Sequence, residues 1–87
     1  MKYLYREGDL IKVEETVGAF NVAMEILSGV DYAKFDIDPI EASVLVSFVR
    51  VSAMARGDAK LIESCNNILS KLSVQVQAYI VLLEYTT

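Results

Sequence analysis

The first third of the chain has hydrophobic residues at every third or fourth position. The main series is Val13, Val17, Phe20, Met24 and Leu27. This spacing predicts a helix that begins between residues 9 and 13 and ends near Gly29, because glycine commonly terminates helices. A second, smaller series follows the same helix: Gly18, Ala19, Val22 and Ile26. This second series either packs inside the domain or forms a contact face that a partner helix can approach closely.

Three segments have a pattern typical of strands. Residues 1–6 (MKYLYR) form a candidate edge strand, and in residues 32–38 Phe35 and Ile37 would share one face. Residues 43–55 are rich in β-branched side chains, which favour strands. A turn around Pro39 would join the last two strands into an antiparallel hairpin, because proline donates no ladder hydrogen bond.

The same region leaves a helical interpretation open. Asp38 and Glu41, on either side of a proline, match a helix start in which Asp38 is the N-cap and Glu41 completes a capping box. A helix through the following segment would align Ser43, Ser47 and Arg50 as a polar stripe.

The period changes to a helical one after Gly57. Asp58 is a candidate N-cap, and the apolar positions beyond it recur at spacings of three and four. They are Leu61, Cys65, Ile68, Leu72, Val76, Tyr79 and Leu83. Residues 74–85 also alternate, so they either continue this helix, the interpretation we favour, or form the last strand of a β-α-β-β-α-β unit.

These elements predict a single domain over residues 1–87 with an α+β fold. The expected order is β-α-β-β-α, with a short antiparallel three-stranded sheet and two helices packed on one of its faces. The alternative is an all-α bundle of three helices. In that case the chain would act as a small helical adaptor or inhibitor through helix–helix contacts with a partner.

Composition indicates that the chain works with a partner. Hydrophobic residues make up 54% of 87 residues, and the mean hydropathy is +0.38. A domain of this size buries only about 60% of its unfolded surface, so much apolar surface stays exposed unless another chain covers it. No uncharged run reaches the roughly 18 residues of a membrane span, and residues 1–6 lack the apolar core of a signal peptide.

Charge is distributed unevenly along the chain. The net charge is −4, and residues 1–41 hold nine of the twelve acidic residues. A chain this acidic is a poor nucleic-acid binder by itself. The basic residues Arg50, Arg56 and Lys60 are candidate nucleic-acid contacts within a larger assembly, although solvated or paired charges are the favoured interpretation of the two arginines.

The sequence offers no constellation for catalysis, a cofactor or a metal. It has no histidine, no glycine-rich phosphate loop and a single cysteine, Cys65. Asp31, Asp36 and Asp38 lie close together, but their spacing does not match a calcium loop. We therefore expect a non-enzymatic protein without cofactors, in the reducing cytoplasm.

Residues 55–76 (ARGDAKLIESCNNILSKLSVQV) resemble the C-terminal motif of the small dimerisation subunits of the KEOPS complex, a family that includes the cancer/testis antigens. The matching positions are Asp58, Leu61, Ser64, Asn67, Leu69 and Leu72. Ile62 stands where the family usually has arginine. The family's element order, β-α-β-β-α, is the one expected here.

The resemblance implies a dimerisation and scaffold subunit. Such a subunit would form a homodimer or heterodimer and pack its helices against the catalytic transferase subunit, in a complex that adds threonylcarbamoyl to tRNA adenosine. It would meet tRNA only as part of that complex. The candidate partner-binding or core residues are Phe20, Met24, Ile68, Leu72, Val76 and Tyr79.

Overall fold

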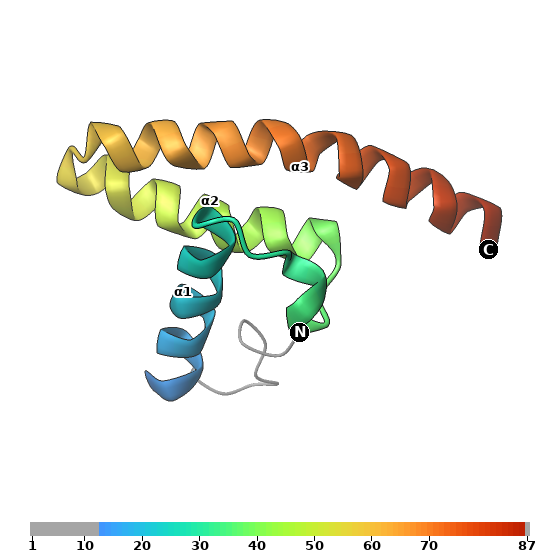
Figure 1. Ribbon diagram of the computed structural model, residues 1–87, viewed down its shortest axis with the longest axis horizontal. Helices are drawn as coiled ribbons and strands as arrows, with labels where there is room; N and C mark the ends of the chain where they lie inside the picture. The colour runs from blue at the N-terminus through green and yellow to red at the C-terminus, as the bar shows by residue number, and fades with distance from the viewer. Residues whose placement is uncertain (1–12, 87) are drawn as a thin grey trace.

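The described part of the chain, residues 13–86 with side chains from Gly18 onward, is helical in this computed structural model. Its elements are α1 (Val13–Leu27), the 3₁₀ helix η1 (Tyr32–Phe35), α2 (Pro39–Arg56) and α3 (Ala59–Thr86). α2 and α3 form an antiparallel hairpin, and α1 packs across α2 with a smaller contact to α3 (Figure 1). The predicted α+β fold is therefore wrong for these residues, and the three-helix alternative describes them.

The predicted strand at residues 32–38 is instead a short 3₁₀ turn between two helices. Oδ1 of Asp31 accepts a hydrogen bond from the backbone N–H of Ala33 at 3.0 Å, which starts the turn. Asp36 ends it in the left-handed conformation, with φ of 56°. Neighbouring aspartates that bond to nearby backbone groups favour such turns over strands. The predicted strand at residues 1–6 lies outside the described residues.

The predicted strand at residues 43–55 is the body of α2. The helix starts with the capping box of the alternative helical interpretation. The side chain of Asp38 accepts a hydrogen bond from the N–H of Glu41 at 2.8 Å, and the side chain of Glu41 accepts one from the N–H of Asp38 at 3.1 Å. Its buried positions follow a helical period. They are Pro39, Ala42, Leu45, Val46, Val49 and Ala53. Packing of this face overrides the strand propensity of the valines.

A tight turn at Gly57 joins α2 to α3. Gly57 has φ of +69°, a conformation that glycine adopts without strain, and the N–H of Asp58 donates to the carbonyl of Ala53 at 2.9 Å. Oδ1 of Asp58 then accepts from the N–H of Leu61 at 3.2 Å, so the predicted N-cap is confirmed. The helix runs without a break to Thr86, which confirms the helical interpretation of residues 74–85.

The core lies where the three helices meet, and its largest fully buried side chains are Leu45, Val46, Val49 and Cys65. α1 contributes Ala19, Val22 and Ile26 of its smaller apolar series to this core, together with Ala23. Small side chains let the two helix backbones approach closely, so packing inside the domain is the role of this series. Phe20 and Met24, from the larger series, are exposed.

Candidate interaction surface

α2 is apolar on its outer face as well as on its buried face. We call the exposed set the outer stripe, and it consists of Ile40, Val44, Phe48, Val51 and Met54. These residues recur at spacings of three and four, so they share one side of the helix. Phe48 is 57% exposed and Val51 is 63% exposed. A helix that is apolar on opposite sides is normally covered on both, and the described residues cover only one.

An apolar groove of about 660 Å³ runs between the outer stripe and α3. Its lining from α2 is Ile40, Ser43, Val44, Ser47, Phe48 and Val51, and its lining from α3 is Leu69, Ser73, Val76 and Gln77. None of the ten lining residues is charged. The groove therefore presents a surface that suits the apolar face of another protein segment.

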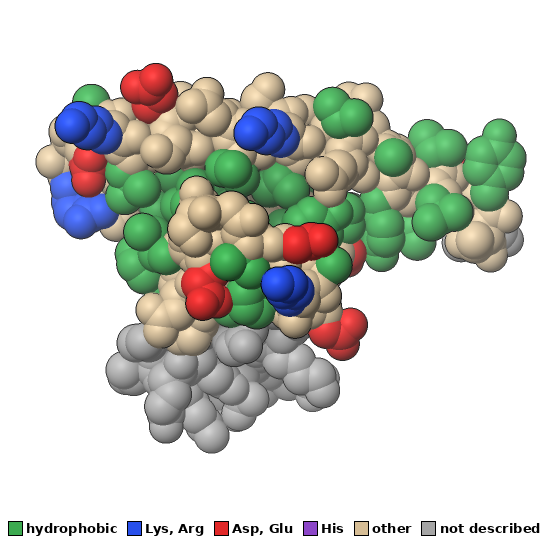
Figure 2. Space-filling view, viewed as in Figure 1, with side chains coloured by type: hydrophobic (Ala, Val, Ile, Leu, Met, Phe, Trp, Pro, Cys, Tyr) green, Lys and Arg blue, Asp and Glu red, His purple; other side chains and the backbone are tan. Residues whose placement is uncertain are grey.

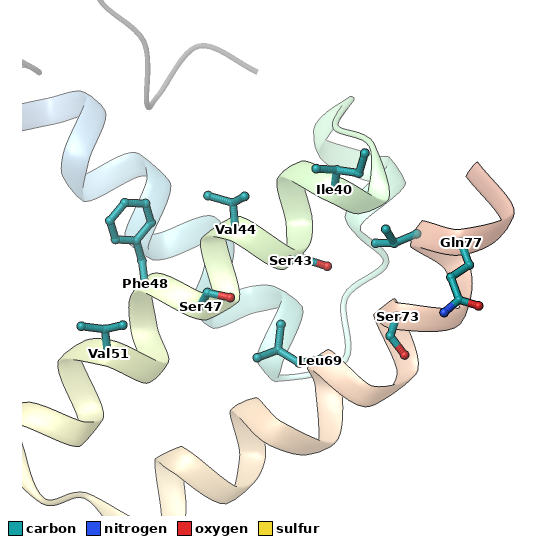
Figure 3. Close-up of a pocket in the computed structure, with 10 residues that line it drawn as sticks. Ile40, Ser43, Val44, Ser47, Phe48, Val51, Leu69, Ser73 and Gln77 are labelled. Atoms are coloured by element: carbon teal, nitrogen blue, oxygen red, sulfur yellow. The ribbon is translucent and has the colours of Figure 1, made fainter. Parts of the chain in front are cut away.

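The hollow follows from the serines at the α2–α3 seam. Ser43 and Ser47 point from α2 toward α3, and Leu69 points from α3 into the same space (Figure 3). Side chains as small as serine leave the space between the two helices partly unfilled. In the helix these two serines and Arg50 form the polar stripe that the helical interpretation predicted, and the stripe lies along this seam.

Polar contacts hold α3 in place on both of its flanks. Nε of Arg50 donates to Oδ1 of Asn66 at 2.7 Å, which links α2 to α3. The hydroxyl of Tyr32 donates to Oε1 of Gln75, which links η1 to α3. Burial raises the pKa of the Tyr32 phenol, and the charges of Asp31 and Asp38 raise it further, so the hydroxyl keeps the proton that it donates.

The C-terminal end of α3 projects beyond the hairpin. α3 has 28 residues and α2 has 18, and α3 continues past the start of α2 (Figure 1). We call residues 77–86 the overhang. Its exposed apolar residues are Ile80, Val81, Leu82, Leu83 and Tyr85, and Tyr85 is 86% exposed. Apolar side chains gather over this projecting end in Figure 2.

The six predicted partner-binding residues fall into three groups. Leu72, which is 4% exposed, and Ile68 belong to the packing between α3 and the rest of the core. Phe20 and Met24 are exposed on α1. Val76 lines the groove, and Tyr79 is half-buried at the root of the overhang. The outer stripe was missed because it lies in the segment interpreted as a strand.

The three predicted nucleic-acid contacts have different surroundings in the structure. Arg50 is engaged with Asn66, as described above. Arg56 donates from Nε to the carbonyl of Ser52 at 3.4 Å, within α2. Lys60 is exposed in the first turn of α3, on the other side of the turn that contains Asp58. Their role in binding nucleic acid stays a prediction.

The described residues offer neither a metal-binding cluster nor a membrane-spanning helix. Residues 13–86 contain no group of three or more histidine, cysteine, aspartate or glutamate residues placed to hold a metal ion. Over the same range, no helix combines the length and the hydropathy that crossing a membrane requires. Burial raises the pKa of the one thiol, Cys65, and nearby Arg50 partly opposes this, so the sulfur is held as a neutral core group.

No family model, curated protein or solved structure matches this chain. These comparisons therefore leave the resemblance to KEOPS subunits a prediction. Residues 55–76, which carry that resemblance, fold as the end of α2, the turn at Gly57 and the first part of α3. The strands that the family's element order requires are absent from residues 13–86.

Proposed function

We propose that this chain is a helical protein–protein interaction module that binds a helix of a partner protein in the groove between α2 and α3. The observation that carries the proposal is the outer stripe, a continuous apolar and uncharged face on the side of α2 opposite its buried face. An amphipathic helix that lays its apolar side into such a groove is a recurrent mode of recognition.

The chemistry of the groove sets the kind of partner. Apolar side chains such as Val44, Phe48 and Leu69 provide the contact area, and Ser43 and Ser47 provide hydroxyl groups beside it. A matching helix carries aliphatic or aromatic residues at spacings of three and four, with charged residues only at its edges. Small side chains along the seam also let a second helix backbone approach closely.

The proposal follows the helical-adaptor alternative because the fold implied by the KEOPS resemblance contains a sheet, and residues 13–86 contain no strand. Identification of the protein that binds in the groove decides whether the partner helix belongs to a transferase subunit.

Site-specific photo-crosslinking in the native cell tests the proposed function. A photoreactive amino acid replaces Phe48 in the groove, and the matched control places it at Lys71, which is exposed on α3 but does not line the groove. We expect one discrete crosslinked species from position 48 and none from position 71, and mass spectrometry should identify a bound segment with apolar residues at spacings of three and four. Absence of a species at 48, or the same products from both positions, would refute the proposal.

A further inference from the structure

The overhang has the composition of a buried helix although it is exposed. Among residues 77–86 Glu84 is the one charged residue, and apolar side chains occupy every side of the helix. An α-helix that is apolar all round is found in the interior of a protein or an assembly. The overhang therefore needs a covering surface that residues 13–76 do not supply.

The groove ends where the overhang begins, because Gln77 belongs to both. One uncharged and mostly apolar seam crosses this boundary along α3, with spacings of four, three, four and three. It consists of Leu69, Ser73, Val76, Ile80 and Leu83. This is the spacing of residues that face a second helix in a coiled coil. The same side of α3 thus lines the groove in its middle and continues uncovered into the overhang.

We propose that the partner in the groove is a second copy of this chain, with the overhang of each copy lying in the groove of the other. This inference rests on the proposed function, since it names the occupant of the same groove. The pairing is antiparallel about a two-fold axis near Val76 and Gln77. At 1.5 Å per residue, the ten residues of the overhang are about 15 Å long, and the nine residues of α3 that span the groove, residues 69–77, are about 14 Å long. The two lengths match, so both contacts form at once.

The exposed apolar area is large enough for a stable dimer. With each side chain taken at its ordinary full area, the outer stripe and the overhang leave on the order of 1,000 Å² exposed on each molecule. A stable interface buries roughly 800 Å² on each partner. Both surfaces are formed by one chain, so a symmetric dimer buries the groove-lining part of the outer stripe and the seam side of the overhang without a third protein.

Sedimentation velocity of the full chain tests this inference. We expect a species of twice 9.7 kDa at micromolar concentration. Ile80→Glu in the overhang and Phe48→Glu in the groove each place an unpaired charge in the contact, and each weakens the dimer about 100-fold or more. The matched control is Val74→Glu, at a residue of α3 that is 69% exposed and does not line the groove, and it keeps the dimer. Circular dichroism checks that all three variants stay helical.

Mixing the two disrupted variants separates reciprocal docking from other kinds of dimer. The groove of Ile80→Glu and the overhang of Phe48→Glu are both intact, so an equimolar mixture regains a measurable dimer that neither variant forms alone. A monomeric wild type, a dimer that both variants leave unchanged, or a mixture that stays monomeric would overturn the inference. If the chain is monomeric and position 48 crosslinks to a different protein, the inference fails and the proposed function stands. If it is monomeric and crosslinks to nothing, both fail.

Discussion

Arg50 on α2 and Asn66 on α3 are joined by a hydrogen bond of 2.7 Å that fixes the relative position of the two helices. The bond lies on the groove side of the hairpin, on the same polar stripe as Ser43 and Ser47. Changing the register of α2 against α3 would move this bond and the groove together. The shape of the candidate binding site therefore depends on a side-chain contact that does not itself line it.

The Arg50–Asn66 pair should show measurable coupling in a double-mutant cycle. A hydrogen bond to a charged group at a partly exposed site contributes about 0.5–1.5 kcal/mol, so Arg50→Ala and Asn66→Ala should be less than additive by that amount. Urea denaturation of the two single variants and the double variant measures it. Strict additivity would mean that the bond does not hold the hairpin.

Val49 and Val51 give a direct test of the helical assignment of α2. Two residues apart, they would share one face of a strand, but in the helix Val49 is fully buried and Val51 is 63% exposed. We expect Val49→Ala to lower the free energy of unfolding by about 1–3 kcal/mol and Val51→Ala to change it by less than about 0.5 kcal/mol. Denaturant unfolding in dilute solution, where self-association is weakest, provides the measurement. Equal losses from the two substitutions would contradict the assignment.

Cys65 should make stability fall at alkaline pH. Burial raises the pKa of its thiol in the folded chain, while the unfolded thiol ionises near its ordinary pKa of about 8.5. Above that pH the unfolded chain binds fewer protons than the folded chain, so each further pH unit lowers the free energy of unfolding by up to about 1.4 kcal/mol, until the folded thiol also ionises.

The Cys65→Ala variant is the control for this pH dependence. It begins less stable because of the cavity it leaves, but the extra loss between pH 8.5 and 9.5 disappears. Urea titrations at several pH values compare the two slopes. Parallel slopes in the wild type and the variant would show that the thiol is not the group responsible.

The sequence predicted α1 and α3 because the helical period dominates in both, although residues 74–85 of α3 also alternate as a strand would. In α3, Asp58 and the apolar series from Leu61 to Leu83 agree on one element, and the structure has that element from Ala59 to Thr86. In α3 the local sequence signals and the tertiary packing both favour a helix, so the short-range pattern was sufficient to predict it.

The sequence did not predict α2 because two periods coincide in it. Val44, Val46 and Phe48 alternate as a strand would, while Ala42, Val46, Val49 and Ala53 repeat as a helix does. Only contact with α1 and α3 selects the second set. The local signal that favoured the helix was the capping box of Asp38 and Glu41. The groove was missed for the same reason, since it exists only when the outer stripe and α3 are both helical.

Cysteine labelling at Val51 tests the central claim, that the outer stripe is covered in the working protein. Val51→Cys reacts with a maleimide in native cells and as dilute purified chain, with buried Cys65 as the internal reference and Lys71→Cys as the exposed control. We predict that Val51→Cys is labelled at least tenfold more slowly in cells, while Lys71→Cys reacts equally in both. Fast labelling of Val51→Cys in both settings would contradict the claim.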